Sequence, residues 1–456
     1  MDKLSDRPST GHGKTVKITP AARVYILGAM LSTALTMGSR HFDDRGGPHF
    51  MGFLTLAGIV YLLAIREFFA TPRFSRRVIV IGLVMAAAWQ IEFLRLPPGA
   101  DDDIHRYVWD GRLQRLGYNP YLVVPSDPAV EWLHTPETRN LNNPDLPSPY
   151  PAGAQLFFRA VTAIQETTFA IKAAFVACEF AIVFVLLDIL RLTGKGPHLV
   201  LAFAWNPLLA IEVAGSGHID IVGALLLLLS AAALVRRWRP TAAVAIGLAI
   251  AVKFLPIVLL PLYWKRVRIR DGALAAAVVI LLYVPFLNHG RIPIGSLGTY
   301  VQNFRFNGPV FAALDRVAPP QLLAALAVFV GLAAATWLRR SVAPSEWSAN
   351  QFAWPMAASL LCAPAVFPWY LLWLLPFLTS ASMLLIALWT VSIVPVYIMW
   401  HLRTLGRPWG ALPGWVMLLE YGCLAGAGAI LALRRSTGSN VPWPRGPVEP
   451  RQPHYK

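Results

Sequence analysis

The segment from residue 101 to residue 121 reads DDDIHRYVWDGRLQRLGYNPY and brings three adjacent aspartates, an arginine and a further aspartate into an otherwise apolar chain. If the stretch that begins at Asp103 is helical, Asp103, Arg106 and Asp110 share one face, with Tyr107 beside them. Carboxylates and a guanidinium crowded together at a bilayer surface indicate that a polar or phosphorylated group is handled there.

Transfer of a sugar from a lipid phosphate to a hydroxyl group is the reaction that these residue types fit. A sugar 1-phosphate diester has a good leaving group, so the reaction needs a base for the incoming hydroxyl and a cation near the departing phosphate. A glycosidase must protonate a poor leaving group and therefore uses two carboxyl groups. We expect Asp103 or Asp102 to be the base. The candidates for holding the phosphate are Arg106, which offers a bidentate fork, Lys253, which offers a point charge, and His218.

The composition defines the surroundings of these residues. Hydrophobic residues make up 56% of the 456 and charged residues 14%, whereas a soluble domain carries about 25% charged residues. We therefore expect an all-α polytopic membrane protein with about 11 to 14 transmembrane or half-membrane helices. The three cysteines lie inside apolar runs, which excludes a disulfide framework or a cysteine metal cluster.

The net charge of +16 does not indicate a nucleic-acid partner, because the Lys and Arg residues recur in short bursts between apolar runs. This is the positive-inside pattern of membrane proteins. We expect a basic cytoplasmic segment over residues 1–23, a transmembrane domain over 24–435 with its first span retained, and a disordered cytoplasmic tail over 436–456. The other segments expected inside are residues 66–77, 191–196, 236–239, 265–270 and 339–340.

Two apolar runs need special treatment in this topology. A single helix over residues 241–264 would place the basic segments at 236–239 and 265–270 on opposite sides of the membrane. A break at Lys253 makes a hairpin of two short helices and keeps both segments inside, with Lys253 at the outer turn. Residues 151–165, which include Arg159, are predicted to form a helix on the outer surface rather than a span.

Residues 95–150 then form a long outer loop, which holds eight of the 24 Asp and Glu residues. Loops of this length are uncommon unless they are functional, so we expect the catalytic residues here. The alternative function is transport or flipping of a lipid-linked sugar. A transporter would place ionisable residues near the midplane on broken helices of both halves, whereas here they concentrate at one surface.

The outer loop resembles the first outer loop of GT-C glycosyltransferases that use polyprenyl-phosphate sugars, in particular bacterial mannosyltransferase-like members of glycosyltransferase family 87. Their pattern is D-D-I-Y-R-Y-x-W-D-G, five variable residues, then G-x-N-P-Y, and His105 departs from it where tyrosine is usual. Similar features continue at residues 150–155, 205–220, 253–261 and 368–377. The matching residues of the loop are Asp102, Asp103, Arg106, Tyr107, Trp109, Asp110, Gly111, Gly117, Asn119, Pro120 and Tyr121.

The resemblance implies a GT-C-like multi-pass enzyme of the cytoplasmic membrane whose active site faces the periplasm or the cell exterior. It implies a polyprenyl-phosphate-hexose donor, with mannose the expected hexose, a glycan or glycolipid acceptor, and inversion at the anomeric carbon. We expect neither a metal nor another cofactor, and the hexose, the acceptor and the linkage stay open. The residues expected to bind substrate are Tyr107, Trp109, Asp110, Asn119, Tyr121 and Asp220.

Simpler structural roles compete for several of these residues. Asp101 is expected to cap the helix, and Asp110 could form a surface ion pair with Arg112. His218 could be an ordinary loop histidine, although Glu212 and Asp220 lie close to it in the sequence. Lys253 could extend its ammonium toward lipid phosphates.

Overall fold

The structure is a computed structural model that describes residues 18–99, 103–341, 348–408, 410 and 412–436. Within these residues the chain forms helices joined by loops, and strand-like pairing is limited to isolated bridges. The prediction of an all-α polytopic membrane protein is confirmed.

The described part of the chain contains eight helical segments that are long and apolar enough to cross a membrane, or nine if one bent pair counts as a single span. The eight are α1 Pro20–Ser39, α2 Pro48–Ala70, α3 Arg76–Leu94, α6 Thr168–Leu192, α10 with η6 Ile269–Phe286, α13 Pro320–Arg340, the segment Ala381–Thr404, and α17 Gly414–Ser436.

Shorter helices fill the space between them. The α-helices are α4 Asp103–Arg115, α5 Ala152–Ile164, α7 Val200–Ala204, α8 Asp220–Val235, α9 Arg239–Val252, α11 Leu297–Asn303, α12 Pro309–Leu314, α14 Ala349–Leu361, α15 Leu384–Ser392 and α16 Ile398–Thr404. The others are η1 Phe42–Asp44, η2 Pro128–Leu133, η3 Pro197–Leu199, η4 Leu209–Gly215, η5 Leu255–Tyr263, η6 Val284–Phe286, η7 Pro368–Trp373, η8 Leu375–Phe377, η9 Ala381–Met383 and η10 Val394–Tyr397.

Local sequence signals set several helix starts. Thr19, Ser75 and Thr167 precede α1, α3 and α6, and each side-chain hydroxyl accepts a hydrogen bond from a backbone N–H of the first turn. Pro20 follows Thr19 at a position where its missing N–H costs nothing. The spans therefore begin where the sequence supplies a cap.

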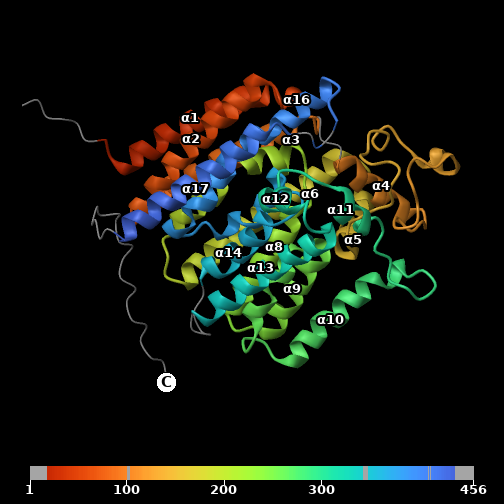
Figure 1. Ribbon diagram of the computed structural model, residues 1–456. Helices are drawn as coiled ribbons and strands as arrows, with labels where there is room; N and C mark the ends of the chain where they lie inside the picture. The colour runs from red at the N-terminus through yellow and green to blue at the C-terminus, as the bar shows by residue number, and fades with distance from the viewer. Residues whose placement is uncertain (1–17, 100–102, 342–347, 409, 411, 437–456) are drawn as a thin grey trace, which may run out of the picture.

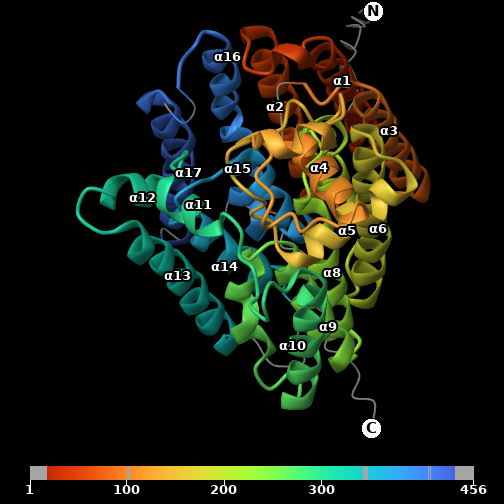
Figure 2. The ribbon, with the colours of Figure 1, turned by 90° about the vertical axis from the view of Figure 1, so that its right-hand side faces the viewer.

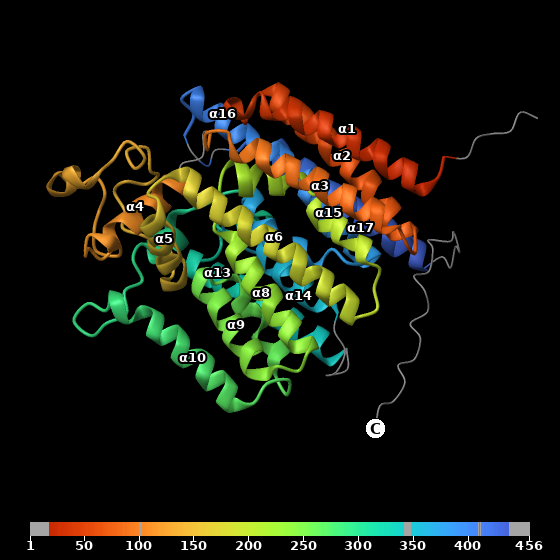
Figure 3. The same ribbon diagram turned by 180° about the vertical axis from the view of Figure 1, so that it is seen from behind.

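The helices are arranged as two packed groups. Helices α1 and α2 pack along each other, and α3 lies beside α1 (Figure 3). Helices α8, α9 and α10 pack in chain order, with α10 at the edge of the molecule (Figure 1). Helices α4 and α5 pack on each other and against α6 (Figure 2), so the loop that carries the aspartates is joined to the bundle at one end.

One span is broken in the middle. The stretch Pro197–Ala204 and the stretch Leu209–Gly215 bend by 66° relative to each other. Asn206 and Pro207 stand at the break, where proline restricts the residue before it and cannot donate a backbone hydrogen bond. The second piece, η4, is a wide turn of the π type, a geometry that is frequent at functional sites.

The predicted break at Lys253 is confirmed. Helix α9 ends at Val252, Lys253 has an extended backbone, and η5 begins at Leu255. Lys253 contacts Asp220 at the start of α8, so α8 and α9 run antiparallel. Tyr263 at the end of η5 returns to Ser230, farther along α8. The basic segments 236–239 and 265–270 consequently lie toward the same end of the bundle, as predicted.

The helix predicted over residues 151–165 is also present, as α5. It has 13 residues, which is fewer than the roughly 20 that a full span needs. Its buried face, with Ala154 and Phe158, packs against α4. Helix α5 therefore supports the aspartate-bearing helix and does not add a span.

Candidate active site

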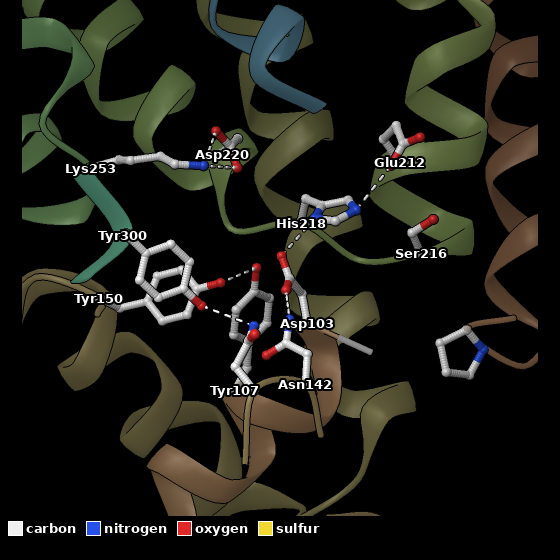
Figure 4. Close-up of polar contacts among 12 residues, drawn as sticks. Asp103, Tyr107, Asn142, Tyr150, Glu212, Ser216, His218, Asp220, Lys253 and Tyr300 are labelled. Atoms are coloured by element: carbon white, nitrogen blue, oxygen red, sulfur yellow. Dashed lines mark hydrogen bonds and ion pairs between the residues drawn. The ribbon is translucent and has the colours of Figure 1, made fainter. Parts of the chain in front are cut away.

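Asp103 is the first residue of α4 and one of the two charged groups of the site that remain accessible, with 18% of its side chain exposed. The amide of Asn142 donates a hydrogen bond to Oδ1 of Asp103. Oδ2 lies 3.9 Å from Nδ1 of His218. Asp103 is therefore contacted from two sides (Figure 4) while part of its side chain stays exposed.

His218 lies directly behind Asp103 and its side chain is fully buried. Nε2 of the ring is 3.0 Å from Oε2 of Glu212, which is also fully buried. The ring of Trp369 stacks on the imidazole at a centroid distance of 3.9 Å. This burial separates His218 from a lipid phosphate, so the structure places it beside Asp103 rather than in the expected phosphate contact.

A glycine makes this approach possible. Gly217 has a φ of +82°, and a Cβ atom at that position would lie 2.6 Å from the side chain of Ile104 in α4. Both the positive φ and the close contact exclude larger residues. The GSGH sequence after η4 thus brings His218 against the start of α4.

Lys253 is the second accessible charge, with 24% of its side chain exposed. Its Nζ lies 2.8 and 2.9 Å from the two carboxylate oxygens of Asp220, which is buried. The indole N–H of Trp373 donates to the same carboxylate, at 2.7 Å. The ammonium also lies 4.1 Å from the ring centre of Tyr370, a favourable cation–π arrangement.

Three tyrosines complete the site. The hydroxyl groups of Tyr107 and Tyr150 are 3.5 Å apart, and Tyr300 of α11 accepts a hydrogen bond from Asn143. Burial, and then the charge of Asp103, raises the pKa of Tyr150 well above its ordinary value. Tyr150 therefore stays neutral and its hydroxyl can donate. These hydroxyls lie on the Asp103 side of the site (Figure 4) and are suited to sugar hydroxyls.

The arrangement offers one accessible carboxylate and one accessible ammonium, set on different elements (Figure 4). In the described part of the chain, no group of three or more His, Cys, Asp or Glu side chains is arranged to hold a metal ion. Among the described residues, the group around Asp103 therefore presents one carboxylate and one ammonium with exposed surface.

Arg106 lies elsewhere than sequence analysis expected. Its guanidinium donates to the backbone carbonyls of Asn142, Asn143 and Leu146 at 2.7 to 3.0 Å, and the residue is 2% exposed. A buried guanidinium with these partners fastens the loop that carries Asn142. In this structure Arg106 fixes the loop of Asn142, which is the hydrogen-bond partner of Asp103, and its guanidinium is too buried to contact a phosphate.

We expect Arg106→Ala to lower the thermal unfolding midpoint and to increase proteolysis between Asn142 and Leu146. The variant removes a guanidinium that donates to three carbonyls of a half-buried loop, and hydrogen bonds to charged groups contribute about 1.5–3 kcal/mol. Arg139→Ala is the control, because Arg139 forms an exposed ion pair with Glu131 and such pairs contribute little. If the Arg106→Ala protein has normal stability but binds the donor more weakly, the structural role is wrong and Arg106 belongs to the phosphate site.

Asp110 belongs to a buried network that joins α4 to α5. Ser148 and Gln155 donate to its carboxylate at 2.5 and 2.8 Å. Burial raises the pKa of Asp110 to about 6, although Arg106 and these two hydrogen bonds favour the charged form. The expected alternative, a surface ion pair with Arg112, is wrong: Arg112 pairs with Glu166 instead.

Three other predicted binding residues lie outside the group around Asp103. Trp109 is buried in a small core beside α4 and stacks on His134 at 4.2 Å. Asn119 donates to the carbonyl of Phe286, and Tyr121 donates to the carbonyl of Tyr150. Tyr121 also lines a surface pocket of about 630 Å³ whose lining does not include Asp103, His218 or Lys253.

The structure thus brings together five of the predicted residues and adds several that sequence reasoning did not assign. Asp102 lies outside the described residues. The five are Asp103, Tyr107, His218, Asp220 and Lys253. The unassigned contributors are Asn142, Tyr150, Glu212, Tyr300, Trp369, Tyr370, Trp373 and Tyr397. The aromatic segment 368–377 was the sequence signal for three of them.

Comparison with known proteins gives one match. Residues 20–267 match the model of the family described as alpha-(1->6)-mannopyranosyltransferase, N-terminal domain. No curated protein and no solved structure matches the chain. The matched region extends from the first span to beyond Lys253 and covers more than half of the 456 residues, and the chain therefore belongs to this mannosyltransferase family.

Proposed function

We propose that this glycosyltransferase moves mannose from a polyprenyl-phosphate-mannose donor to a hydroxyl of a glycan or glycolipid on the outer face of the cytoplasmic membrane. The observation that carries the proposal is that an accessible carboxylate, Asp103, and an accessible ammonium, Lys253, both belong to the group of residues around His218 and Asp220 (Figure 4). The mannosyltransferase family supports the sugar and the type of reaction.

In the proposed reaction Asp103 takes the proton of the acceptor hydroxyl while the oxygen attacks the anomeric carbon. The bond between that carbon and the phosphate oxygen breaks, and its electron pair leaves with the polyprenyl phosphate. Lys253 stabilises the charge that builds on the phosphate. A single displacement inverts the anomeric centre, so an α-mannoside product requires a β-linked donor.

The position of Lys253 suits a donor anchored in lipid. The lysine follows the last residue of α9 at the turn of a hairpin of two short helices. Because α9 has 14 residues, fewer than the roughly 20 that a full span needs, we expect the turn to lie within the apolar layer, at a depth that the phosphate of a membrane-embedded donor reaches. A soluble nucleotide sugar would have no need of a cation at this place.

The direct test is transfer by the purified protein in lipid nanodiscs. Labelled polyprenyl-phosphate mannose with envelope lipids as acceptor should yield a labelled product, and labelled nucleotide-linked mannose should yield none. The Asp103→Asn protein is the matched negative control, which should give no labelled product. Transfer from the nucleotide sugar alone would overturn the proposed donor. Movement of the labelled lipid across proteoliposomes without any new product would favour the flippase.

The proposed orientation is tested by cysteine labelling in a variant that lacks the three native cysteines. A cysteine at Ser126, an exposed residue of the outer segment, should react in intact cells or spheroplasts with a membrane-impermeant maleimide. A cysteine at the exposed Arg239, toward the basic end of the bundle, should react only after permeabilisation. The reverse pattern would place the site in the cytoplasm.

A further inference from the structure

We propose that Glu212 and His218 form a buried charge pair behind Asp103 that keeps Asp103 ionised and correctly oriented, with Tyr397 and Trp369 holding the pair in place. In this arrangement His218 carries a proton on each ring nitrogen. Glu212, His218, Tyr397 and Trp369 are positioning residues, because they act through Asp103. The inference rests on the proposed role of Asp103 as the base.

The geometry forms a continuous line of polar groups. The hydroxyl of Tyr397 donates to Oε1 of Glu212, and Oε2 of the same carboxylate is 3.0 Å from Nε2 of His218. The other ring nitrogen, Nδ1, is 3.9 Å from Asp103. Glu212 and His218 have no exposed side-chain surface, whereas Asp103 has 18%. The line therefore runs from the protein interior to the one member that a substrate can reach.

The backbone fixes this line as firmly as the side chains do. The N–H of His218 donates to the carbonyl of Glu212 at 2.9 Å, and the N–H of Ser216 donates to the carbonyl of Ile211 at 2.7 Å. These bonds close the wide turn at the end of η4. The indole of Trp369 then covers one face of the imidazole, with 8° between the two planes. The ring can neither tilt nor turn without breaking these contacts.

The charges around the ring favour the imidazolium. Among the described residues, the carboxylates that face the ring are Asp103 from α4 and Glu212 from η4. Arg45 from η1 bonds to Ser216, and Lys172 from α6 donates to the carbonyl of Leu96. Asp220 is neutralised by Lys253. A neutral ring with its proton on Nε2 would turn the lone pair of Nδ1 toward the carboxylate of Asp103, whereas an imidazolium places a positive charge between the two acids.

The pair has a clear use in the proposed reaction. A base must be ionised and aimed at the acceptor hydroxyl before the hydroxyl arrives. The imidazolium favours the ionised form of Asp103 and restrains one of its oxygens, while Asn142 restrains the other. A buried carboxylate that fixes the orientation of an imidazole is also the arrangement of the Ser-His-Asp triad. Here the imidazole supports a carboxylate instead of a serine.

Two of the four positioning residues come from the part of the chain beyond the family match. Trp369 and Tyr397 follow residue 267, where the match ends. Glu212 and His218 lie within it. The second half of the bundle is therefore needed to complete the site, and its contribution is the orientation of a residue carried by the first half.

The test is the pH dependence of kcat for His218→Gln and Glu212→Gln, measured with saturating donor. Glutamine at 218 removes the cation, so kcat should fall about 10- to 100-fold, with little change in the donor KM. The acidic limb of the profile should move to higher pH by about one unit or more. Glutamine at 212 removes the charge that favours the imidazolium, so the alkaline limb should move to lower pH.

Two further variants keep the result interpretable. Glu179→Gln replaces another buried carboxylate, midway along α6, and should leave both limbs in place. Tyr397→Phe removes only the hydroxyl that donates to Glu212. Without that donor the carboxylate attracts the imidazolium more strongly, so the alkaline limb should move to higher pH, opposite to its movement in Glu212→Gln. This variant provides the test if Glu212→Gln does not fold.

A loss of kcat with both limbs unchanged in His218→Gln and Tyr397→Phe would show that these residues are only structural, and the proposal would be abandoned. This outcome is separate from failure of the proposed function. If Asp103→Asn protein stays active, the base is wrong. If Asp103→Asn protein is inactive and the pH limbs do not move, the base stands and the charge pair alone is rejected.

Discussion

Asp103→Asn is expected to abolish mannosyl transfer while the protein still inserts into the membrane and unfolds at its normal temperature. Asparagine has nearly the same shape and can still accept the hydrogen bond that Asn142 donates, but it cannot take a proton from the acceptor. Loss of a general base typically lowers the rate about 10²- to 10⁴-fold. The measurement is kcat at saturating donor, together with the thermal midpoint in detergent.

Asp145→Asn is the matched control, because Asp145 lies in the same segment, residues 95–150, and its carboxylate accepts a hydrogen bond from the exposed Ser126. Its transfer rate should stay near that of the unmodified protein. Asp102 is the competing base in the sequence and is compared in the same assay. If Asp102→Asn protein is inactive and Asp103→Asn protein is fully active, the base is Asp102.

Lys253→Met is expected to lower kcat about 100-fold or more, beyond any loss of donor affinity. The ammonium is proposed to meet charge that develops on the phosphate as the glycosidic bond breaks, and contacts of this kind are stronger in the transition state. Lys253→Arg should recover only part of the rate, since a planar fork replaces a point charge. The measurement is kcat and the donor KM for each variant.

Lys253 has a second role that the experiment must separate, because its loss leaves the buried carboxylate of Asp220 without its ion pair. An uncompensated buried charge is strongly destabilising. The double variant Lys253→Met with Asp220→Asn removes both charges and should recover thermal stability but not transfer. Recovery of transfer in the double variant would show that the lysine serves only to neutralise Asp220.

Much of the fold follows from the sequence because the membrane restricts the solutions. Backbone groups in lipid must be paired internally, so apolar runs become helices. The bursts of Lys and Arg indicate which ends of these helices lie on the same side of the membrane. The break at Lys253 follows from the same reasoning, since one unbroken helix would separate two basic segments. The resemblance to the glycosyltransferase family rests mainly on the short stretch 101–121, whose residue types can be recognised in the sequence without any structure.

Helical spacing does not determine which residues of that stretch face the substrate. It puts Asp103, Arg106 and Asp110 on neighbouring positions, but what covers each one depends on distant segments. The loop at 142–146 has carbonyls that no helix or strand satisfies, and Arg106 supplies their donors. Asp110 is enclosed by Ser148 and Gln155 in the same way. The hydrogen-bond needs of an irregular loop decide these two roles.

The sequence alone therefore determines an all-α membrane protein of a glycosyltransferase type, with a third of its acidic residues in the segment 95–150 and a break at Lys253. The tertiary structure decides that Asp103 and Lys253 stay accessible, that His218 is buried behind Asp103, and that Glu212 and Tyr397 support it. Tyr397 stands 185 residues from Glu212. A contact over that separation depends on how the helices pack and on the geometry of a broken span, which no local pattern specifies.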